Sequence, residues 1–345
     1  MKLLMITRKV DKGEHLAGFI YNWVKKIGEQ VEELRVISWQ EGDSSGLPEN
    51  IKINHLKTNQ NKLVKIFKFK MLVKKNIKQV DGVFCHQMPI YTILAAPIAK
   101  LYKKKVVSWY MHRQIDSKMK LMEKLADVVL SASKESFRLA SKKLVITGHG
   151  IDVELFKPGT KQVDGKFKIL SVGRISPTKD YESMIKAVDI LVDSGVKNIK
   201  LTIIGDAGLA IQKGYFENLK LMVQNMKLQE QVEFLGPIPQ IQIPKYLQNS
   251  DLFINMSGTG SVDKTVLEAM ACECLVLTSN EAFKDIVGSN FMVGKDNPKD
   301  LAEKIKQLMN LSKEEKQQIR SKLRNEVVQN HNLDNLVKRI TEQFK

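Results

Sequence analysis

The chain has 345 residues, of which 43% are hydrophobic and 27% charged. This mixture is typical of a globular protein, excludes a disordered or fibrous chain, and provides enough length for two domains with separate cores. The net charge is +17, and the basic surplus lies in residues 1–160, which hold 29 Lys and Arg against 15 Asp and Glu.

Short apolar or β-branched runs alternate with longer amphipathic stretches along the whole chain, which predicts parallel sheets with crossover helices. The predicted strands of the first half are residues 2–7, 34–39, 82–86, 106–110, 128–131 and 144–147. Those of the second half are residues 168–172, 201–205, 232–235, 252–255 and 275–278. Residues 156–166 contain Gly, Pro and polar residues and predict a linker between the halves.

This rhythm predicts an α/β protein with two doubly wound parallel-sheet domains, and the ligand site is expected in the cleft between them. We expect an N-terminal domain at residues 1–158, a C-terminal domain at 159–330, and a C-terminal helix at 331–345 that is able to cross back to the first domain.

Three cysteines are too few and too unevenly placed for a disulfide framework. The opening residues lack a cleavage site of the secretory type, and no stretch approaches the roughly 18 apolar residues of a spanning helix. We therefore expect a cytoplasmic protein.

Two segments have the pattern of a ligand site. In residues 169–191 a buried-type strand leads into a loop with Arg174 and Lys179 and then a helix, an arrangement that suits a diphosphate. In residues 250–280 a strand leads into the small polar loop 257–261 and a helix with Glu268, whose carboxylate can accept hydrogen bonds from ribose hydroxyls. The alternatives are solvated loop cations and an exposed helix glutamate.

Together these residues resemble a known family. The pattern GR-x4-K at Arg174 and Lys179, and VLEAMA around Glu268, resemble the signature of the family-4 retaining glycosyltransferases, which have the GT-B fold. The resemblance extends to ADVVLSAS at 126–133, GHGIDVELFKP at 148–158 and VEFLGPI at 232–238. The two predicted domains would then be the Rossmann-like halves of a GT-B protein.

The resemblance implies transfer of a sugar from a nucleoside diphosphate sugar, with the anomeric configuration kept and no metal or other cofactor. The first domain would bind the acceptor and the second the donor. Arg174 and Lys179 would hold the diphosphate and stabilise the leaving phosphate, and Glu268 would hold the ribose. His112 resembles the histidine beside the donor sugar, and Gly13 in loop 8–16 matches the family's phosphate loop.

The sequence departs from the family pattern at two positions. Gly260 stands where a second glutamate is usual, so Asp263, or the N–H groups around Gly260 and Ser261, would have to contact the donor sugar. Glu273 stands where glycine is more common. The chain contains no D-x-D pattern and no histidine pair at helical spacing, and we therefore predict no metal site.

Residues 57–80 contain eight lysines and no acidic residue. Ile66, Phe69, Val73, Ile77 and Val80 fall at helical spacing, which predicts either a basic amphipathic helix on an anionic membrane or a helix packed on the first domain with its lysines in water. Membrane binding would make the protein peripheral at the inner face of the membrane.

The sequence thus predicts a glycosyltransferase of polysaccharide or glycolipid biosynthesis, with a nucleoside diphosphate sugar and a lipid-linked, glycan or small-molecule acceptor as partners. No nucleic acid is expected. Two alternatives stay open: a non-catalytic protein that binds an anionic surface or nucleic acid, suggested by the basic first half and Gly260, and a nucleotide-sugar epimerase.

Overall fold

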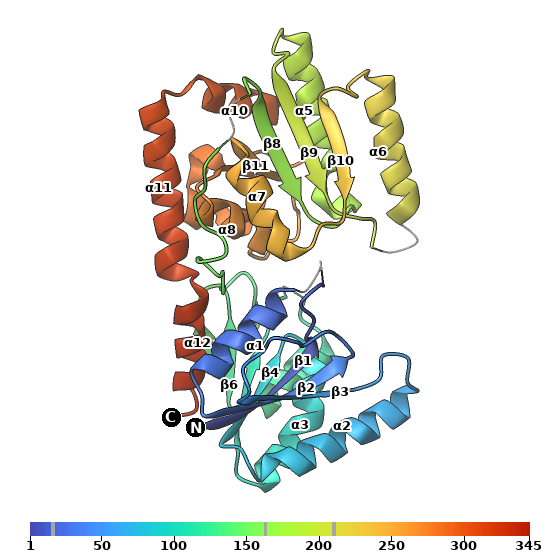
Figure 1. Cartoon of the computed structure of the whole chain (residues 1–345), viewed down its shortest axis with the longest axis vertical. Coiled ribbons are helices and arrows are strands. Elements are labelled where there is room, and N and C mark those ends of the chain that lie inside the picture. Colours follow the sequence, from blue (N-terminus) through green and yellow to red (C-terminus); the bar gives the residue numbers. More distant parts are fainter. Residues whose placement is uncertain (15–17, 113, 162–163, 209–211) are drawn as a thin grey trace. The chain divides into compact units, whose positions relative to one another are not determined.

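The computed structural model describes residues 1–14, 18–112, 114–161, 164–208 and 212–345. Residues 15–16 of the loop that contains Gly13, and residues 162–163 of the predicted linker, lie outside the described residues. The chain divides into two compact units: unit 1 comprises residues 1–152 and 330–345, and unit 2 comprises residues 153–329. Each unit is an α/β layer structure around a parallel sheet (Figure 1).

The described part of unit 1 contains a seven-stranded parallel sheet with the order β3-β2-β1-β4-β5-β6-β7. Its strands are β1 (Lys2–Lys9), β2 (Glu33–Gln40), β3 (Ile51–His55), β4 (Gly82–His86), β5 (Lys105–Trp109), β6 (Val128–Ser131) and β7 (Leu144–Ile146). Six of them confirm predicted strands. The edge strand β3 was not predicted, because only its first residue is buried and its apolar pattern is correspondingly weak.

Helices cover both faces of this sheet because successive residues of a strand point to opposite sides. Leu3 and Met5 of β1 join one core cluster with α1 (Phe19–Glu29) and α12 (Leu333–Glu342). Leu4 and Ile6 join the other cluster, with α2 (Lys62–Ile77) and α3 (Pro89–Leu101). Helix α4 (Ser117–Leu125) follows β5. Figure 1 shows α1 and α2 on opposite sides of the sheet.

Helix α2 corrects one expectation about residues 57–80. Phe69, Val73 and Ile77 are fully buried and pack on the sheet together with Val80. These four members of the predicted stripe belong to the core and are not available to a membrane. For this stripe the second interpretation holds, in which the helix packs on the first domain.

The described part of unit 2 contains a five-stranded parallel sheet with the order β10-β9-β8-β11-β12. Its strands are β8 (Phe167–Val172), β9 (Ile199–Ile204), β10 (Val232–Gly236), β11 (Leu252–Asn255) and β12 (Leu275–Thr278), each within two residues of its prediction. The helices around it are α5 (Tyr181–Asp193), α6 (Lys213–Asn225), α7 (Ile243–Gln248), α8 (Lys264–Ala271), α9 (Lys284–Val287), α10 (Pro298–Asn310) and α11 (Lys313–Asn330).

In the described ranges, no helix combines the length and the apolar character needed to cross a bilayer. Residues 157 and 161 of the predicted linker are tied to unit 2. The Lys157 carbonyl accepts a hydrogen bond from the Gln248 amide at 2.8 Å, and Lys161 pairs with Asp251.

The inward packing of α2 makes a testable prediction about stability. Phe69→Ala should lower the free energy of unfolding by about 3–5 kcal/mol, because a buried aromatic ring leaves a cavity. Phe67→Ala, on the same helix but 65% exposed, should change it by less than about 0.5 kcal/mol. Urea denaturation of both variants measures the difference, and equal losses would contradict the packing described here.

Candidate functional site

The carboxyl ends of β8 and β11 lie side by side in the sheet of unit 2. The two strands pair in parallel, with Ile169 opposite Leu252 and Leu170 opposite Phe253. From this pair the sheet grows in opposite directions, through β9 on one side and β12 on the other. Such a reversal of strand order is where doubly wound sheets bind ligands. The loops after β8 and β11 are therefore the first candidates for a site.

The loop after β8 carries Arg174 and Lys179. Lys179 ends the 3-10 turn η1 (Pro177–Lys179), and Asp180 caps α5 by accepting the Ser183 N–H at 3.2 Å. The Tyr181 hydroxyl donates to the Gly173 carbonyl at 3.1 Å and ties the start of α5 to the end of β8. The backbone around the two cations is thus held at both ends.

Two glycines allow the next loop to pass close to Arg174. Gly205 has a φ of +151°, and a Cβ there would lie 1.9 Å from the Gly173 carbonyl oxygen. At Gly208 a Cβ would lie 3.1 Å from Cδ of Arg174. Any side chain at Gly205 would push the loops apart, so the position of Arg174 depends on this backbone contact.

The loop after β11 is attached to the loop after β8 by a backbone bond, in which the Gly258 N–H donates to the Thr178 carbonyl at 3.1 Å. Within the loop, the buried Ser257 hydroxyl donates to the Thr259 hydroxyl at 3.1 Å. Gly260 has a φ of +64°, a conformation that favours glycine over the glutamate expected from the family pattern.

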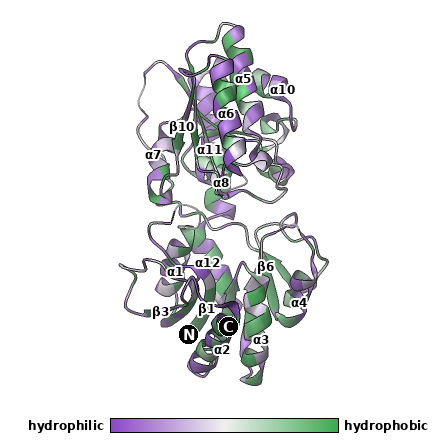
Figure 2. Cartoon of the chain, turned by 90° about the vertical axis from the view of Figure 1, so that its right-hand side faces the viewer, coloured by the Kyte–Doolittle hydropathy of each residue, from purple (hydrophilic) through white to green (hydrophobic). Residues whose placement is uncertain are grey.

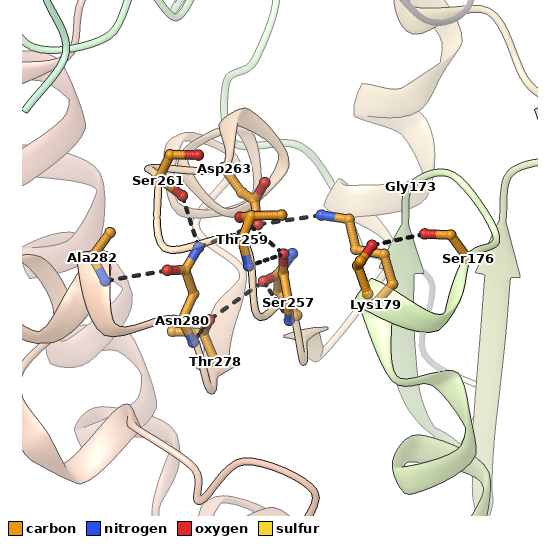
Figure 3. Close-up of polar contacts among 12 residues, drawn as sticks. Gly173, Ser176, Lys179, Ser257, Thr259, Ser261, Asp263, Thr278, Asn280 and Ala282 are labelled. Atoms are coloured by element: carbon orange, nitrogen blue, oxygen red, sulfur yellow. Dashed lines mark hydrogen bonds and ion pairs between the residues drawn. The ribbon is translucent and has the colours of Figure 1, made fainter. Parts of the chain in front are cut away.

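Lys179 and Asp263 are brought together from the two loops. Asp263 occupies the N-cap position of α8, but its carboxylate does not cap the helix. Instead it accepts from Nζ of Lys179 at 3.2 Å and from Nδ2 of Asn280 at 3.4 Å (Figure 3). Both members of the ion pair are less than one-fifth exposed. The pair is therefore shielded from most of the solvent.

Asn280 was missed by the sequence analysis. It is buried after β12, donates to the Ser261 carbonyl at 2.8 Å and accepts the Ala282 N–H at 3.2 Å (Figure 3). Its amide therefore connects Ser261 and Asp263 to a third strand end. A polar residue directly after a buried strand, beside the loop of the neighbouring strand, was the signal that could have identified it.

Glu268 is buried within α8, so the alternative of an exposed helix carboxylate is wrong. Its Oε1 accepts from the Gln240 amide at 2.7 Å. Lys264, one turn earlier in α8, is the nearby cation. Burial raises the pKa of Glu268 and lowers the pKa of Lys264, because a shielded site penalises both charged forms. Ligand hydroxyls donating to this carboxylate would favour its ionised form.

The remaining predicted residues, His112 and Gly13, lie in unit 1. His112 follows β5, is exposed, and accepts the Gln114 N–H on Nδ1 at 3.2 Å. Gly13 follows β1, is exposed, and donates its N–H to Asp11 at 2.9 Å. Of the residues that the structure describes, a Cβ at Gly13 would meet the Asp11 side chain alone, at 3.7 Å, so the local backbone does not require glycine.

Glu273 follows α8 with a φ of +57°, the left-handed conformation that glycine adopts without strain. This backbone accounts for the glycine that is common there in the family pattern. Among the described residues, no three His, Cys, Asp or Glu side chains are grouped so that they could hold a metal ion.

The fold and the β8–β11 reversal define an α/β protein of two units, each built on a doubly wound parallel sheet. Residues 152–325 match the family described as Glycosyl transferases group 1, which is half of the chain. The chain belongs to this family.

Two curated relatives match a smaller part. Alpha-monoglucosyldiacylglycerol synthase of Streptococcus pneumoniae is 29% identical over 132 residues, which are 38% of this chain and 28% of that protein. Amylovoran biosynthesis glycosyltransferase AmsK of Erwinia amylovora is 29% identical over 149 residues, which are 41% of this chain and 35% of that protein. The chain thus spans about a third of the length of these relatives.

A solved structure matches almost the whole chain. The crystal structure of Anabaena Alr3699/HepE in complex with UDP and glucose has a TM-score of 0.81 at 16% identity, covering 99% of both chains. This likeness confirms the GT-B fold that the sequence predicted.

Proposed function

We propose that the protein is a retaining glycosyltransferase of family 4, which moves a sugar from a nucleoside diphosphate sugar to a glycan or lipid acceptor without a metal ion. The observation that carries the proposal is the Lys179–Asp263 pair at the strand-order reversal, in a chain of the glycosyl transferases group 1 family. Uridine diphosphate glucose is the first donor to test, because the structural neighbour holds UDP and glucose.

In this proposal Arg174 and Lys179 bind the donor diphosphate. Their two positive charges neutralise the charge that grows on the leaving phosphate, a role that a metal ion fills in other transferases. Glu268, with Gln240 on one of its oxygens, accepts hydrogen bonds from the ribose hydroxyls. Unit 2 therefore binds the donor and unit 1 the acceptor.

Asp263 takes the place of the usual glutamate at Gly260. Its carboxylate accepts from Lys179, and a diphosphate would compete with it for that ammonium group. When Lys179 turns to the phosphate, the carboxylate becomes available to sugar hydroxyls. The N–H groups of Gly260 and Ser261 provide further donors beside it.

By their positions in the family pattern, His112 is assigned to the donor sugar and Gly13 to the donor phosphate. The acceptor class is supported by the names of the two relatives, an alpha-monoglucosyldiacylglycerol synthase and an amylovoran biosynthesis glycosyltransferase. A lipid-linked or glycan acceptor suits both.

The proposed reaction is tested by incubating the protein with UDP-sugars and GDP-sugars and with lipid or oligosaccharide acceptors. We expect a transfer product whose anomeric configuration, read by NMR, equals that of the donor, at a rate unchanged by excess EDTA. Inversion, or loss of activity in EDTA that added Mg²⁺ restores, would contradict the mechanism. An epimerised nucleotide sugar without transfer would support the epimerase instead.

The diphosphate assignment predicts that Arg174→Ala and Lys179→Ala each weaken UDP binding by about 1–3 kcal/mol, the range for hydrogen bonds to charged groups. Lys186→Ala is the matched control, because it removes an exposed lysine of α5 away from the loop. Titration calorimetry with UDP measures all three. If both loop variants bound UDP with wild-type affinity, the assignment of these two cations to the diphosphate would be wrong.

The role of Asp263 predicts a split between binding and turnover. Asp263→Asn should lower kcat at least about tenfold, because the lost charge contacts the sugar, while UDP affinity stays equal or rises as Lys179 is released. Asp285→Asn, an exposed site in α9, controls for the lost negative charge. Equal losses of UDP and UDP-sugar affinity would make Asp263 a purely structural residue.

A further inference from the structure

The outer face of α2 is apolar although it lies in water. Leu63 is 76% exposed, Phe67 is 65% exposed and Met71 is 53% exposed, and Val64 lies beside them. Figure 2 shows hydrophobic and hydrophilic residues side by side along α2. We call Leu63, Val64, Phe67 and Met71 the outer apolar face. It is not the stripe that the sequence pattern indicated, since that stripe is packed on the sheet.

Helical geometry separates these two faces. Leu63, Phe67 and Met71 follow one another at intervals of four residues, which places them on one side of the helix. Phe69, Val73 and Ile77 have the same spacing, and at 3.6 residues per turn their side is turned by about 120° from the outer apolar face. Helix α2 is therefore apolar on two sides, and among the described residues of unit 1 only the inner side is packed.

Lysines surround the outer apolar face. Lys68 and Lys70 flank it, and Lys74, Lys75 and Lys78 lie beyond it at the C-terminal end of the helix. All five are exposed, whereas Lys65 is buried, with its ammonium group 5.5 Å from the centre of the Trp39 ring. The surface thus combines large apolar side chains with five exposed lysines.

We propose that this face of α2 docks on an anionic lipid bilayer, with Leu63, Phe67 and Met71 inserted among the acyl chains and the lysines bound to phosphate headgroups. A lipid surface is the partner that takes up both properties at once, apolar side chains and cations. The helix would lie in the plane of the interface, and the buried stripe would remain in the core of unit 1.

The charge pattern favours a bilayer over other occupants. A second copy of the chain would bring two lysine-rich faces together, and their mutual repulsion opposes that contact. A nucleic acid would satisfy the lysines but leave Leu63 and Phe67 in water. An anionic bilayer leaves neither group without a favourable environment.

The test is sedimentation of the full chain with vesicles. Wild-type protein should bind phosphatidylcholine vesicles that contain about 30% phosphatidylglycerol, and binding should fall steeply from 0.1 to 0.5 M salt as screening shortens the Debye length. Lys68→Gln, Lys70→Gln, Lys74→Gln and Lys75→Gln combined should weaken partitioning about 100-fold or more. Leu63→Ser, Phe67→Ser and Met71→Ser combined should weaken it at least about tenfold.

Two matched controls separate this face from a general effect. The first neutralises four exposed lysines of α10 and α11 in unit 2, at Lys299, Lys306, Lys313 and Lys322, and so removes the same charge. The second is Leu221→Ser in α6, an exposed apolar side chain outside the face. Both should bind like wild type, and thermal unfolding should show that every variant is folded.

Three results would overturn the proposal. They are the absence of wild-type binding to anionic vesicles, equal losses in the α2 and control variants, and a stable dimer that the serine variant dissociates while vesicle binding is unchanged. None of these readouts depends on sugar transfer, so the outcome is independent of the proposed reaction.

Discussion

The parallel pairing of β8 with β11 is the constraint on which the candidate site depends. Because the two strands are neighbours and the sheet grows away from them in opposite directions, their carboxyl ends present two loops to the same space. The Gly258–Thr178 backbone bond and the close approach at Gly205 then join these loops to each other and to the loop after β9. The positions of the charged side chains in the candidate site follow from this backbone arrangement.

Several polar side chains at these loops are paired with one another, and a ligand could take the place of one partner in each pair. The Asp263 carboxylate does not cap α8 but accepts hydrogen bonds from Lys179 and Asn280. Glu268 is buried beside Gln240 and Lys264. Burial of these charges costs free energy, as the raised pKa of Glu268 and the lowered pKa of Lys264 express. In our proposal, ribose hydroxyls and a diphosphate supply the partners that offset this cost.

Unit 1 uses one helix for two purposes. The inward side of α2 completes the core above β1 and β2, whereas its outward side keeps large apolar groups among lysines. A helix that only had to cover the sheet would need apolar residues on one side, and solubility would favour polar residues on the other. The proposed lipid contact gives the second apolar side a physical reason.

The sequence alone determined the fold class and every strand of the described residues except β3. It also placed Arg174 and Lys179 in the loop after β8 and Glu268 in the helix after β11, because apolar periodicity and loop chemistry are local properties of the chain. The sequence analysis did not identify strand β3 or the role of Asn280, since both depend on neighbours far away in the sequence. Only the tertiary structure decided that Asp263 pairs with Lys179, that Glu268 is buried, and which side of α2 faces the core. Helical spacing identifies a face but not its partner, because partners are set by packing between segments distant in sequence.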